Sequence, residues 1–214
     1  MNRQNLLKAL RFYFITDDSA PGCTPLEQTR IALLAGATIV QYRNKSFSED
    51  HLAEVVRIRE LCRERGAPLI INDNIPLARR VAADGVHVGQ DDAAPAVARQ
   101  ALGDNAIVGV SVSTPEELVR TDLPPCDYIG TGPVFPTGTK VDAKAVRRLA
   151  GLREIVGISP LPVVAIGGIT ADNAPGCFTA GAAGVAVISF VSRAADPLAN
   201  ARRLAAACSA ARRP

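Results

Sequence analysis

Residues 68–73 read PLIIND, a short apolar run that ends in two polar residues, Asn72 and Asp73. Short apolar runs bounded by Gly, Pro and Asp are typical of strands that are buried on both faces of a parallel sheet. Seven more such runs lie at 12–16 (FYFIT), 38–43 (TIVQYR), 85–89 (GVHVG), 106–111 (AIVGVS), 127–132 (DYIGTG), 162–168 (PVVAIGG) and 184–189 (GVAVIS). Polar residues repeatedly follow these runs, so the pattern predicts an α/β fold, a (β/α)8 barrel with its active site at the C-terminal ends of the strands.

Segments with helical spacing alternate with the apolar runs. Residues 48–65 form the clearest one, with Ser48 as the expected N-cap and Gly66 as the stop signal. Thr114-Pro115 and Asp196-Pro197 open two further helices. Alternating helices and strands predict right-handed βαβ units, and no segment has the composition of a linker. We therefore predict one domain over residues 1–214, with residues 1–11 as an N-terminal extension and residues 12–210 as the barrel.

The composition excludes several classes of protein. The chain of 214 residues is 48% hydrophobic and 21% charged, as in ordinary globular enzymes. Its net charge of +3 comes largely from Arg pairs at 202–203 and 212–213, with no basic stripe of the kind that nucleic-acid binders carry. No apolar run approaches the roughly 20 residues of a membrane helix. We expect no nucleic-acid or membrane partner, and a homo-oligomer is possible.

The cysteines and the N-terminus indicate the compartment. Five cysteines are scattered without CxxC spacing, an odd number that argues against a disulfide framework. The first residues, MNRQNLLKALRFYFITDD, lack the apolar core and cleavage site of a secretory signal. We therefore expect reduced thiols and a cytoplasmic location.

Two carboxylates follow neighbouring strands of the predicted barrel. Asp73 ends the third apolar run, and Asp92 follows the fourth. Mg²⁺ typically takes one or two carboxylates together with waters and substrate phosphates. The alternative is that each Asp only caps the helix that follows it, and Asp91 is a competing ligand. Together, flanked by Asn72 and Gln90, Asp73 and Asp92 favour a metal site.

Basic residues and glycines predict two anion sites around this metal. Arg43 and Lys45 alternate at the end of the second run, so both can face the barrel mouth, and Lys140 lies in the loop PTGTK. These three cations beside Mg²⁺ indicate a di- or triphosphate. The Gly167-Gly168 pair after the seventh run, with a serine at position 189 after the eighth, is typical of a barrel phosphate site that uses backbone amides.

The sequence offers no protein nucleophile with an obvious activating base. The only histidines are His51 and His87, and neither belongs to a plausible Ser–His–Asp or Cys–His arrangement. We interpret His87, inside the fourth run and on one face with Gly85 and Gly89, as a structural residue. A metal-assisted departure of diphosphate, with charge stabilisation as the main contribution, fits such a site.

The motifs, taken in order, resemble those of the thiamine phosphate synthase family. They are QYRNK, IINDN, GVHVGQDD, IVGVS, YIGTGPVFPTGTK, VVAIGGIT and GVAVIS. The resemblance extends from about Phe12 to Pro197. It implies a (β/α)8 barrel transferase that requires Mg²⁺. Such an enzyme joins 4-amino-5-hydroxymethyl-2-methylpyrimidine diphosphate to 4-methyl-5-(2-phosphoethyl)thiazole, and it releases pyrophosphate and thiamine monophosphate by a dissociative substitution.

The resemblance also implies a role for each matching residue. The pyrimidine diphosphate would be held by Gln41, Arg43, Lys45 and Asn72. Mg²⁺ would be bound by Asp73 and Asp92. The diphosphate and thiazole phosphate region would be contacted by Ser111, Thr137, Thr139 and Lys140. The thiazole phosphate would be bound by Gly168, Ile188 and Ser189. The expected catalytic residues are Arg43, Lys45, Ser111 and Lys140.

Three positions depart from the family pattern. Asn44 stands where an acidic residue is common, but it should point away from Arg43 and Lys45. The segment after PTGTK lacks the usual glycines. Ser113 replaces a common His, and the related thiazole tautomerases use a His near this strand end and lose the Asp pair. A tautomerase-like paralogue, or a phosphate-ligand sensor without catalysis, is therefore the alternative, and the intact Asp73 and Asp92 argue against both.

Overall fold

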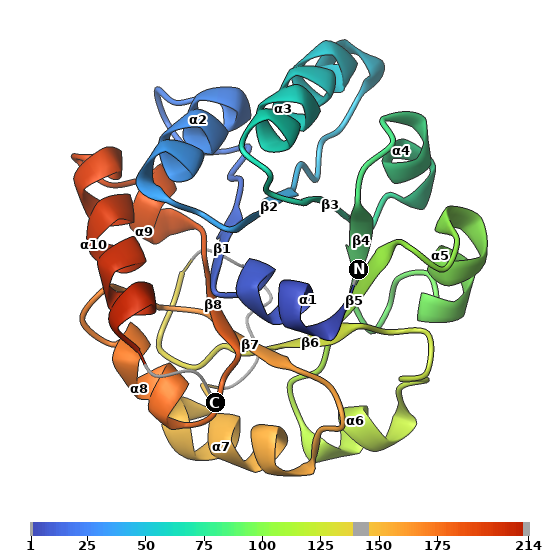
Figure 1. The fold of residues 1–214 in the computed structure, drawn as a ribbon, viewed down its shortest axis with the longest axis vertical. Coiled ribbons are helices and arrows are strands. Elements are labelled where there is room, and N and C mark those ends of the chain that lie inside the picture. The colour runs from blue at the N-terminus through green and yellow to red at the C-terminus, as the bar shows by residue number, and fades with distance from the viewer. Residues whose placement is uncertain (1, 139–145, 212–214) are drawn as a thin grey trace.

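The structure, a computed structural model, describes residues 2–138 and 146–211, and its sheet is a closed barrel of eight parallel strands (Figure 1). Each strand pairs with the next along the chain, and the eighth pairs with the first. The strands are β1 (Phe12–Ile15), β2 (Ile39–Tyr42), β3 (Leu69–Asn72), β4 (Gly85–Val88), β5 (Ile107–Ser111), β6 (Tyr128–Thr131), β7 (Val163–Ile166) and β8 (Gly184–Val187). The predicted (β/α)8 barrel is confirmed, with every strand slightly shorter than its apolar run.

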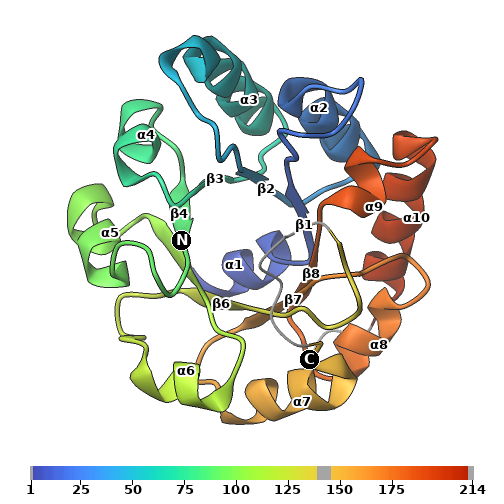
Figure 2. The same cartoon turned by 180° about the vertical axis from the view of Figure 1, so that it is seen from behind.

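Helices follow the strands and form an outer ring around the barrel (Figures 1 and 2). They are α2 (Pro25–Ala35), α3 (Leu52–Glu64), α4 (Ile75–Arg80), α5 (Pro95–Leu102), α6 (Pro115–Arg120), α7 (Arg148–Ile158), α8 (Ala174–Thr179), α9 (Ser189–Ser192) and α10 (Pro197–Ala210). The helix predicted over residues 48–65 is divided, because Ser48 caps a 3-10 turn, η1 (Glu49–His51), that precedes α3. Thr114 and Asp196 cap α6 and α10 as expected.

Two apolar layers hold the barrel together. The inner layer fills the barrel with side chains that point inward from neighbouring strands, among them Tyr13, Ile70 and Tyr128. The outer layer lies between the strands and the helices and contains residues such as Val40 and Leu204. This division follows from the alternation of side chains along each strand, since successive residues point to opposite faces.

The N-terminal extension is ordered as a helix, α1 (Arg3–Ala9), that closes one end of the barrel. Asn2 caps it by accepting a hydrogen bond from the backbone N–H of Asn5 at 2.9 Å. Leu6 and Leu10 join the inner apolar layer, so α1 acts as a plug at the N-terminal ends of the strands. Figure 1 shows α1 across this end of the barrel, nearest the viewer. The opposite end, where the strands finish, remains for the site.

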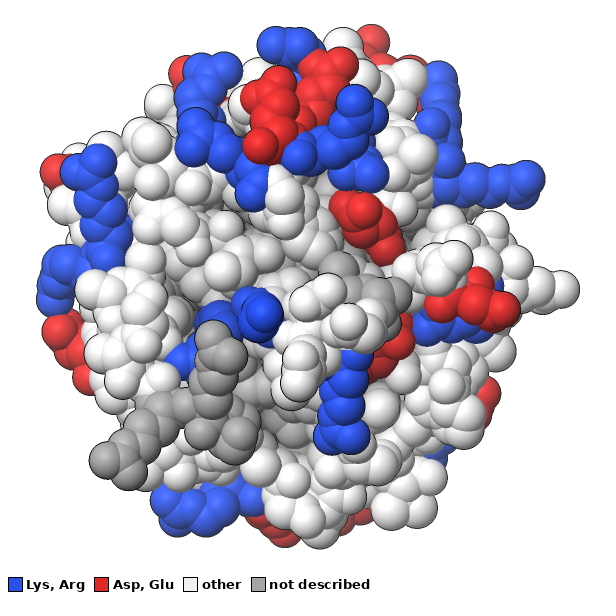
Figure 3. Space-filling model, in the orientation of Figure 1, with Lys and Arg blue, Asp and Glu red and all other residues white. Residues whose placement is uncertain are grey.

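The surface around this plug carries charges of both signs. Lys and Arg side chains lie interspersed with Asp and Glu around the rim of the face that Figure 3 shows. Arg80 and Glu49 form an exposed ion pair elsewhere on the surface, with 2.6 Å between Nη1 and Oε2. None of the helices in the described part of the chain has the length and apolar character that a bilayer crossing requires.

Candidate active site

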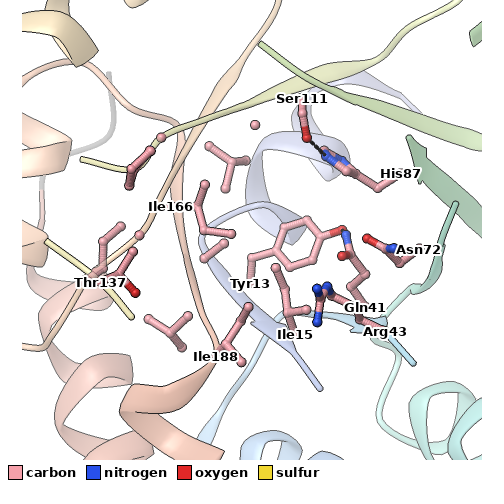
Figure 4. Close-up of a pocket in the computed structure, with 18 of the residues that line it drawn as sticks. Tyr13, Ile15, Gln41, Arg43, Asn72, His87, Ser111, Thr137, Ile166 and Ile188 are labelled. Carbon is pink, nitrogen blue, oxygen red and sulfur yellow. Dashed lines mark hydrogen bonds between the residues drawn. The ribbon is translucent and has the colours of Figure 1, made fainter. Parts of the chain in front are cut away.

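A cavity of about 830 Å³ lies at the C-terminal ends of the strands. Every predicted site residue that the structure describes lines this one cavity. They are Gln41, Arg43, Lys45, Asn72, Asp73, Asp92, Ser111, Thr137, Gly168, Ile188 and Ser189. Thr139 and Lys140 lie outside the described residues. Seven strand ends thus contribute predicted residues to one space, and Figure 4 shows several of these side chains directed into it.

The end of β2 delivers the two basic side chains. Thr16 anchors it, because its Oγ1 accepts from the backbone N–H of Arg43 at 2.9 Å and donates to the Arg43 carbonyl at 3.2 Å. The backbone N–H of Lys45 donates to Asp18 Oδ2 at 3.0 Å. Asn44 points elsewhere, as predicted, and donates to the Tyr42 hydroxyl at 3.2 Å. The cavity therefore has a positively charged wall beside its carboxylates.

The two predicted metal ligands do not cap helices. Asn74 caps α4 with its side chain, and α5 begins after Ala94, so the capping alternative is wrong for both Asp73 and Asp92. The Asp92 carboxylate instead accepts from the backbone N–H of Gly89 at 2.8 Å. Asp73 has a left-handed backbone, with φ +60°, and such conformations outside glycine are uncommon and concentrate at functional sites.

This pair of carboxylates fits a Mg²⁺ ion. Asp73 and Asp92 line the same cavity from neighbouring strand ends, and Asp91 lies beside them. Within the described residues, no three side chains of His, Cys, Asp or Glu converge into a closed metal cage. Mg²⁺ is commonly held by only one or two carboxylates, with waters and substrate phosphates as its other ligands. The oxygen donors present therefore suit this hard cation.

The loops after β7 and β8 form a backbone-lined wall. Gly167 and Gly168 have φ of +96° and +62°, a region that glycine adopts without strain. A Cβ at Gly168 would collide with the Pro136 carbonyl oxygen, so glycine is also required by space. Asn173 fixes the turn, because its Nδ2 donates to the Gly168 carbonyl at 2.9 Å. Backbone held this close to a cavity can offer N–H groups to an anion.

A chain of hydrogen bonds crosses the floor of the cavity. Gln41 Nε2 donates to the Tyr13 hydroxyl at 2.9 Å, and the Tyr13 and Tyr128 hydroxyls are 2.8 Å apart. The His87 ring lies 3.0 Å from the Tyr128 hydroxyl through Nδ1 and 3.0 Å from Ser111 Oγ through Nε2. Figure 4 shows the His87–Ser111 contact and the Tyr13 hydroxyl turned toward Gln41. Burial raises the pKa of both tyrosines, so the hydroxyls stay protonated at neutral pH.

Sequence reasoning missed part of this chain. His87, interpreted as structural, has both ring nitrogens hydrogen-bonded but also lines the cavity. The two glycines on its strand face gave no usable signal, because a Cβ at Gly85 would collide with Ile107 and a Cβ at Gly89 with Asp92. Tyr13 and Tyr128 lie inside apolar runs, and nothing in those runs distinguishes a tyrosine that faces a cavity from one that fills the core.

Arg193, which follows α9, is a further cavity residue that the sequence did not single out. Its Nε donates to Asp17 Oδ2 at 2.7 Å, and its Nη2 donates to Ser19 Oγ at 2.9 Å. Asp17 is only 3% exposed. Burial alone would raise the pKa of Asp17, but the hydrogen bonds from Arg193 and Ser19 outweigh it and hold that pKa below its usual value. The pair fixes a cation at the edge of the cavity.

Fold and site together define a class of protein: a parallel (β/α)8 barrel enzyme with a cavity at the C-terminal ends of its strands, lined by cations, carboxylates and glycine backbone. The family described as thiamine monophosphate synthase matches residues 12–191. The chain therefore belongs to this family and is a transferase of thiamine biosynthesis.

Individual relatives agree with the family match over most of their length. A thiamine-phosphate synthase of Bacillus velezensis is 43% identical over 209 residues, which cover 95% of this chain and 92% of the relative. One from Moorella thermoacetica is 46% identical over 194 residues, 90% of this chain and 92% of the relative. The solved structure of thiamine phosphate pyrophosphorylase from Pyrococcus furiosus superposes with a TM-score of 0.86 at 38% identity, covering 95% of this chain and 98% of that one.

Proposed function

We propose that this chain joins 4-amino-5-hydroxymethyl-2-methylpyrimidine diphosphate to 4-methyl-5-(2-phosphoethyl)thiazole with the help of Mg²⁺, forming thiamine monophosphate and pyrophosphate. The single observation that carries the proposal is the meeting of all the described predicted residues in one cavity. That cavity offers the cations of Arg43 and Lys45 together with the Asp73, Asp91 and Asp92 carboxylates, and it also offers the Gly167-Gly168 turn. Two phosphorylated substrates require this division into two anion sites.

The substitution would proceed by loss of diphosphate before the new bond forms. The bond between the pyrimidine methylene carbon and the diphosphate oxygen breaks, and its electron pair leaves with the diphosphate. The thiazole nitrogen then donates its lone pair to the resulting cation. The protein's part is to hold both substrates in line, exclude water and stabilise the charge that develops on the leaving group.

Each wall of the cavity would have its own task in this reaction. The guanidinium of Arg43 and the ammonium of Lys45 would neutralise diphosphate oxygens, with Lys140 proposed for the same task. Asp73 and Asp92 would hold Mg²⁺, which when bound supplies further positive charge to the leaving group.

The remaining predicted residues would orient the substrates. The pyrimidine diphosphate would be positioned by Gln41, Asn72, Ser111, Thr137 and Thr139. The thiazole phosphate would be bound by Gly168, Ile188 and Ser189. All five cysteines lie in the described part of the chain and none lines the cavity, which supports a reaction without a cysteine nucleophile. The free thiols are also consistent with the cytoplasmic location that we propose.

The tautomerase alternative has less support. Ser113 lines the cavity at the position where those relatives are expected to use a histidine. It is buried, and its backbone N–H donates to Glu117 Oε2 at 2.7 Å. Asp73 and Asp92, which a tautomerase would not need, line the same cavity.

The test is release of pyrophosphate by the purified protein mixed with both substrates, with and without Mg²⁺. We expect release only when both substrates and Mg²⁺ are present, with one thiamine monophosphate formed for each pyrophosphate. No release from a folded protein would contradict the proposal. An aromatisation assay on a thiazole carboxylate would then test the tautomerase function.

A further inference from the structure

The hydrogen-bonded chain on the cavity floor joins five strands in one line. It runs from Gln41 on β2 through Tyr13 on β1, Tyr128 on β6 and His87 on β4 to Ser111 on β5. Tyr13 and Tyr128 are 2% and 1% exposed, so water does not compete for their hydroxyls. A chain whose central hydroxyls are buried and whose links are all made favours one pattern of donors and acceptors.

Two glycines make room for this chain. A Cβ at Gly109 would collide with the ring of Tyr128, and a Cβ at Gly130 would lie 3.1 Å from Cε1 of His87. Neither glycine has a left-handed backbone, so space and not backbone conformation explains them. The strands that flank the two rings are therefore shaped around them.

The distances between Tyr13, Tyr128, His87 and Ser111 fit either direction of the chain, and we assign the direction by counting hydrogens. A tyrosine hydroxyl carries one hydrogen, and a neutral imidazole has one N–H and one acceptor nitrogen. Because Gln41 Nε2 donates to Tyr13, the Tyr13 hydrogen is free to go to Tyr128. The Tyr128 hydrogen then goes to Nδ1 of His87, which leaves the imidazole hydrogen on Nε2 to be donated to Ser111 Oγ.

The direction of the chain decides whether the Ser111 hydroxyl presents its hydrogen or only its lone pairs to the cavity. Its oxygen already accepts from His87, so its own hydrogen is available to a ligand. In the reverse direction Ser111 would donate to His87 and present only lone pairs, which repel an anion. Hydrogen bonds to ionised oxygens are among the strongest in proteins, so the two directions differ strongly for a phosphorylated ligand.

We propose that Tyr13, Tyr128 and His87 are positioning residues that fix the Ser111 hydroxyl as a hydrogen-bond donor to an anionic oxygen of the bound substrate. The identity of that substrate, a pyrimidine diphosphate, rests on the proposed function. The direction of the hydrogen-bonded chain does not, because it is a property of the protein without ligand.

The first test reads the imidazole hydrogen directly by ¹⁵N NMR of the ligand-free protein. The chain has only two histidines, and His51→Gln assigns their signals. His51 is an internal reference, because the backbone N–H of Ser48 donates to its Nδ1 at 3.1 Å, so that the neutral tautomer of this ring carries its hydrogen on Nε2. We expect His87 to be neutral with its hydrogen on Nε2. A hydrogen on Nδ1, or a charged ring at neutral pH, would overturn the proposal.

The second test breaks the chain with Tyr128→Phe and measures inorganic pyrophosphate binding in the presence of Mg²⁺ by calorimetry. We expect binding to weaken roughly tenfold, because Ser111 no longer has a fixed direction, and the His87 signals to change toward a mixture of tautomers. Tyr42→Phe is the matched control. Tyr42 is equally buried, but its hydroxyl accepts from Asn44 in the outer layer.

Unchanged His87 signals and unchanged pyrophosphate binding in Tyr128→Phe would show that Ser111 is oriented without the tyrosines. If Tyr128→Phe does not fold, Tyr13→Phe interrupts the chain one link further away and is read in the same two ways. Neither readout depends on turnover, so a failure of the proposed enzyme activity would leave this test intact.

Discussion

The three aspartates that line the cavity have different surroundings. Asp73 has a strained backbone and accepts a hydrogen bond from Asn72, whereas Asp91 and Asp92 lie exposed at the rim. An exposed carboxylate contributes little to stability, so Asp92 can be changed with little effect on the fold.

We expect Asp92→Ala to lower turnover by about 100-fold or more while the thermal unfolding temperature stays within a few degrees of the unaltered protein. The reason is loss of a proposed Mg²⁺ ligand, since metal charge stabilisation amounts to several kcal/mol and each ~1.4 kcal/mol is tenfold in rate. The measurement is the initial rate of pyrophosphate release at limiting Mg²⁺. Asp91→Ala is the control. Equal losses of turnover in the two variants would contradict the assignment of Asp92, and not Asp91, as the Mg²⁺ ligand.

The alternation of side chains along a strand predicted which of several consecutive residues face the cavity. Arg43 and Lys45 both line the cavity while Asn44 turns away, as a period of two requires. The contact between Tyr13 and Tyr128 could not be predicted in this way, because 115 residues separate the two hydroxyls. Asp73 and Asp92 both line the cavity, and only the structure could exclude helix capping for them.

At the scale of elements, the strands and helix starts were predictable and the loop geometry was not. Eight apolar runs became eight strands, since burial on both faces requires continuous apolar sequence. The helix over 48–65 divided because a 3-10 turn after Ser48 precedes α3, and hydrophobic spacing does not distinguish such a turn from α-helix. The sequence could not predict which backbone the glycine turn after β7 approaches, and only the structure shows it.

This turn gives the second prediction, that Gly168→Ala destabilises the protein by about 2 kcal/mol or more. A left-handed backbone costs a non-glycine residue roughly 1–2 kcal/mol, and the added Cβ also collides with Phe135 and Pro136. The free energy of unfolding in urea measures the effect. Gly138→Ala is the control, because no residue of the described part of the chain lies within 4 Å of its Cβ position. A loss as large in the control would contradict this explanation.

Closure of the barrel is a property of the whole molecule, and it brings the two ends of the sheet together. β1 pairs with β8, and just beyond their ends Asp17 is joined to Arg193 across 176 residues of sequence. Ser192 Oγ also donates to Asp17 Oδ2, at 3.2 Å. Short-range patterns cannot predict such a contact, although the barrel topology requires that the first and last strand ends meet.

The last prediction is that Arg193→Met lowers the free energy of unfolding by about 1–3 kcal/mol at pH 7, because a buried carboxylate then loses its charged partner. The low part of this range is expected, since the Arg193 side chain is 43% exposed. The pKa of Asp17 is lower in the folded than in the unfolded state, where an aspartate titrates at about 3.9, so the stabilisation is complete above that pH and is lost as the pH falls through the folded value. Urea unfolding from pH 7 to pH 3 should therefore show the difference between unaltered protein and variant shrinking with acid. Arg203→Met, which breaks an ion pair that is exposed on both sides, should cost under about 1 kcal/mol throughout. A difference for Arg193→Met that stays constant or grows toward pH 3 would mean that this residue stabilises the barrel through packing and not through the charge of Asp17.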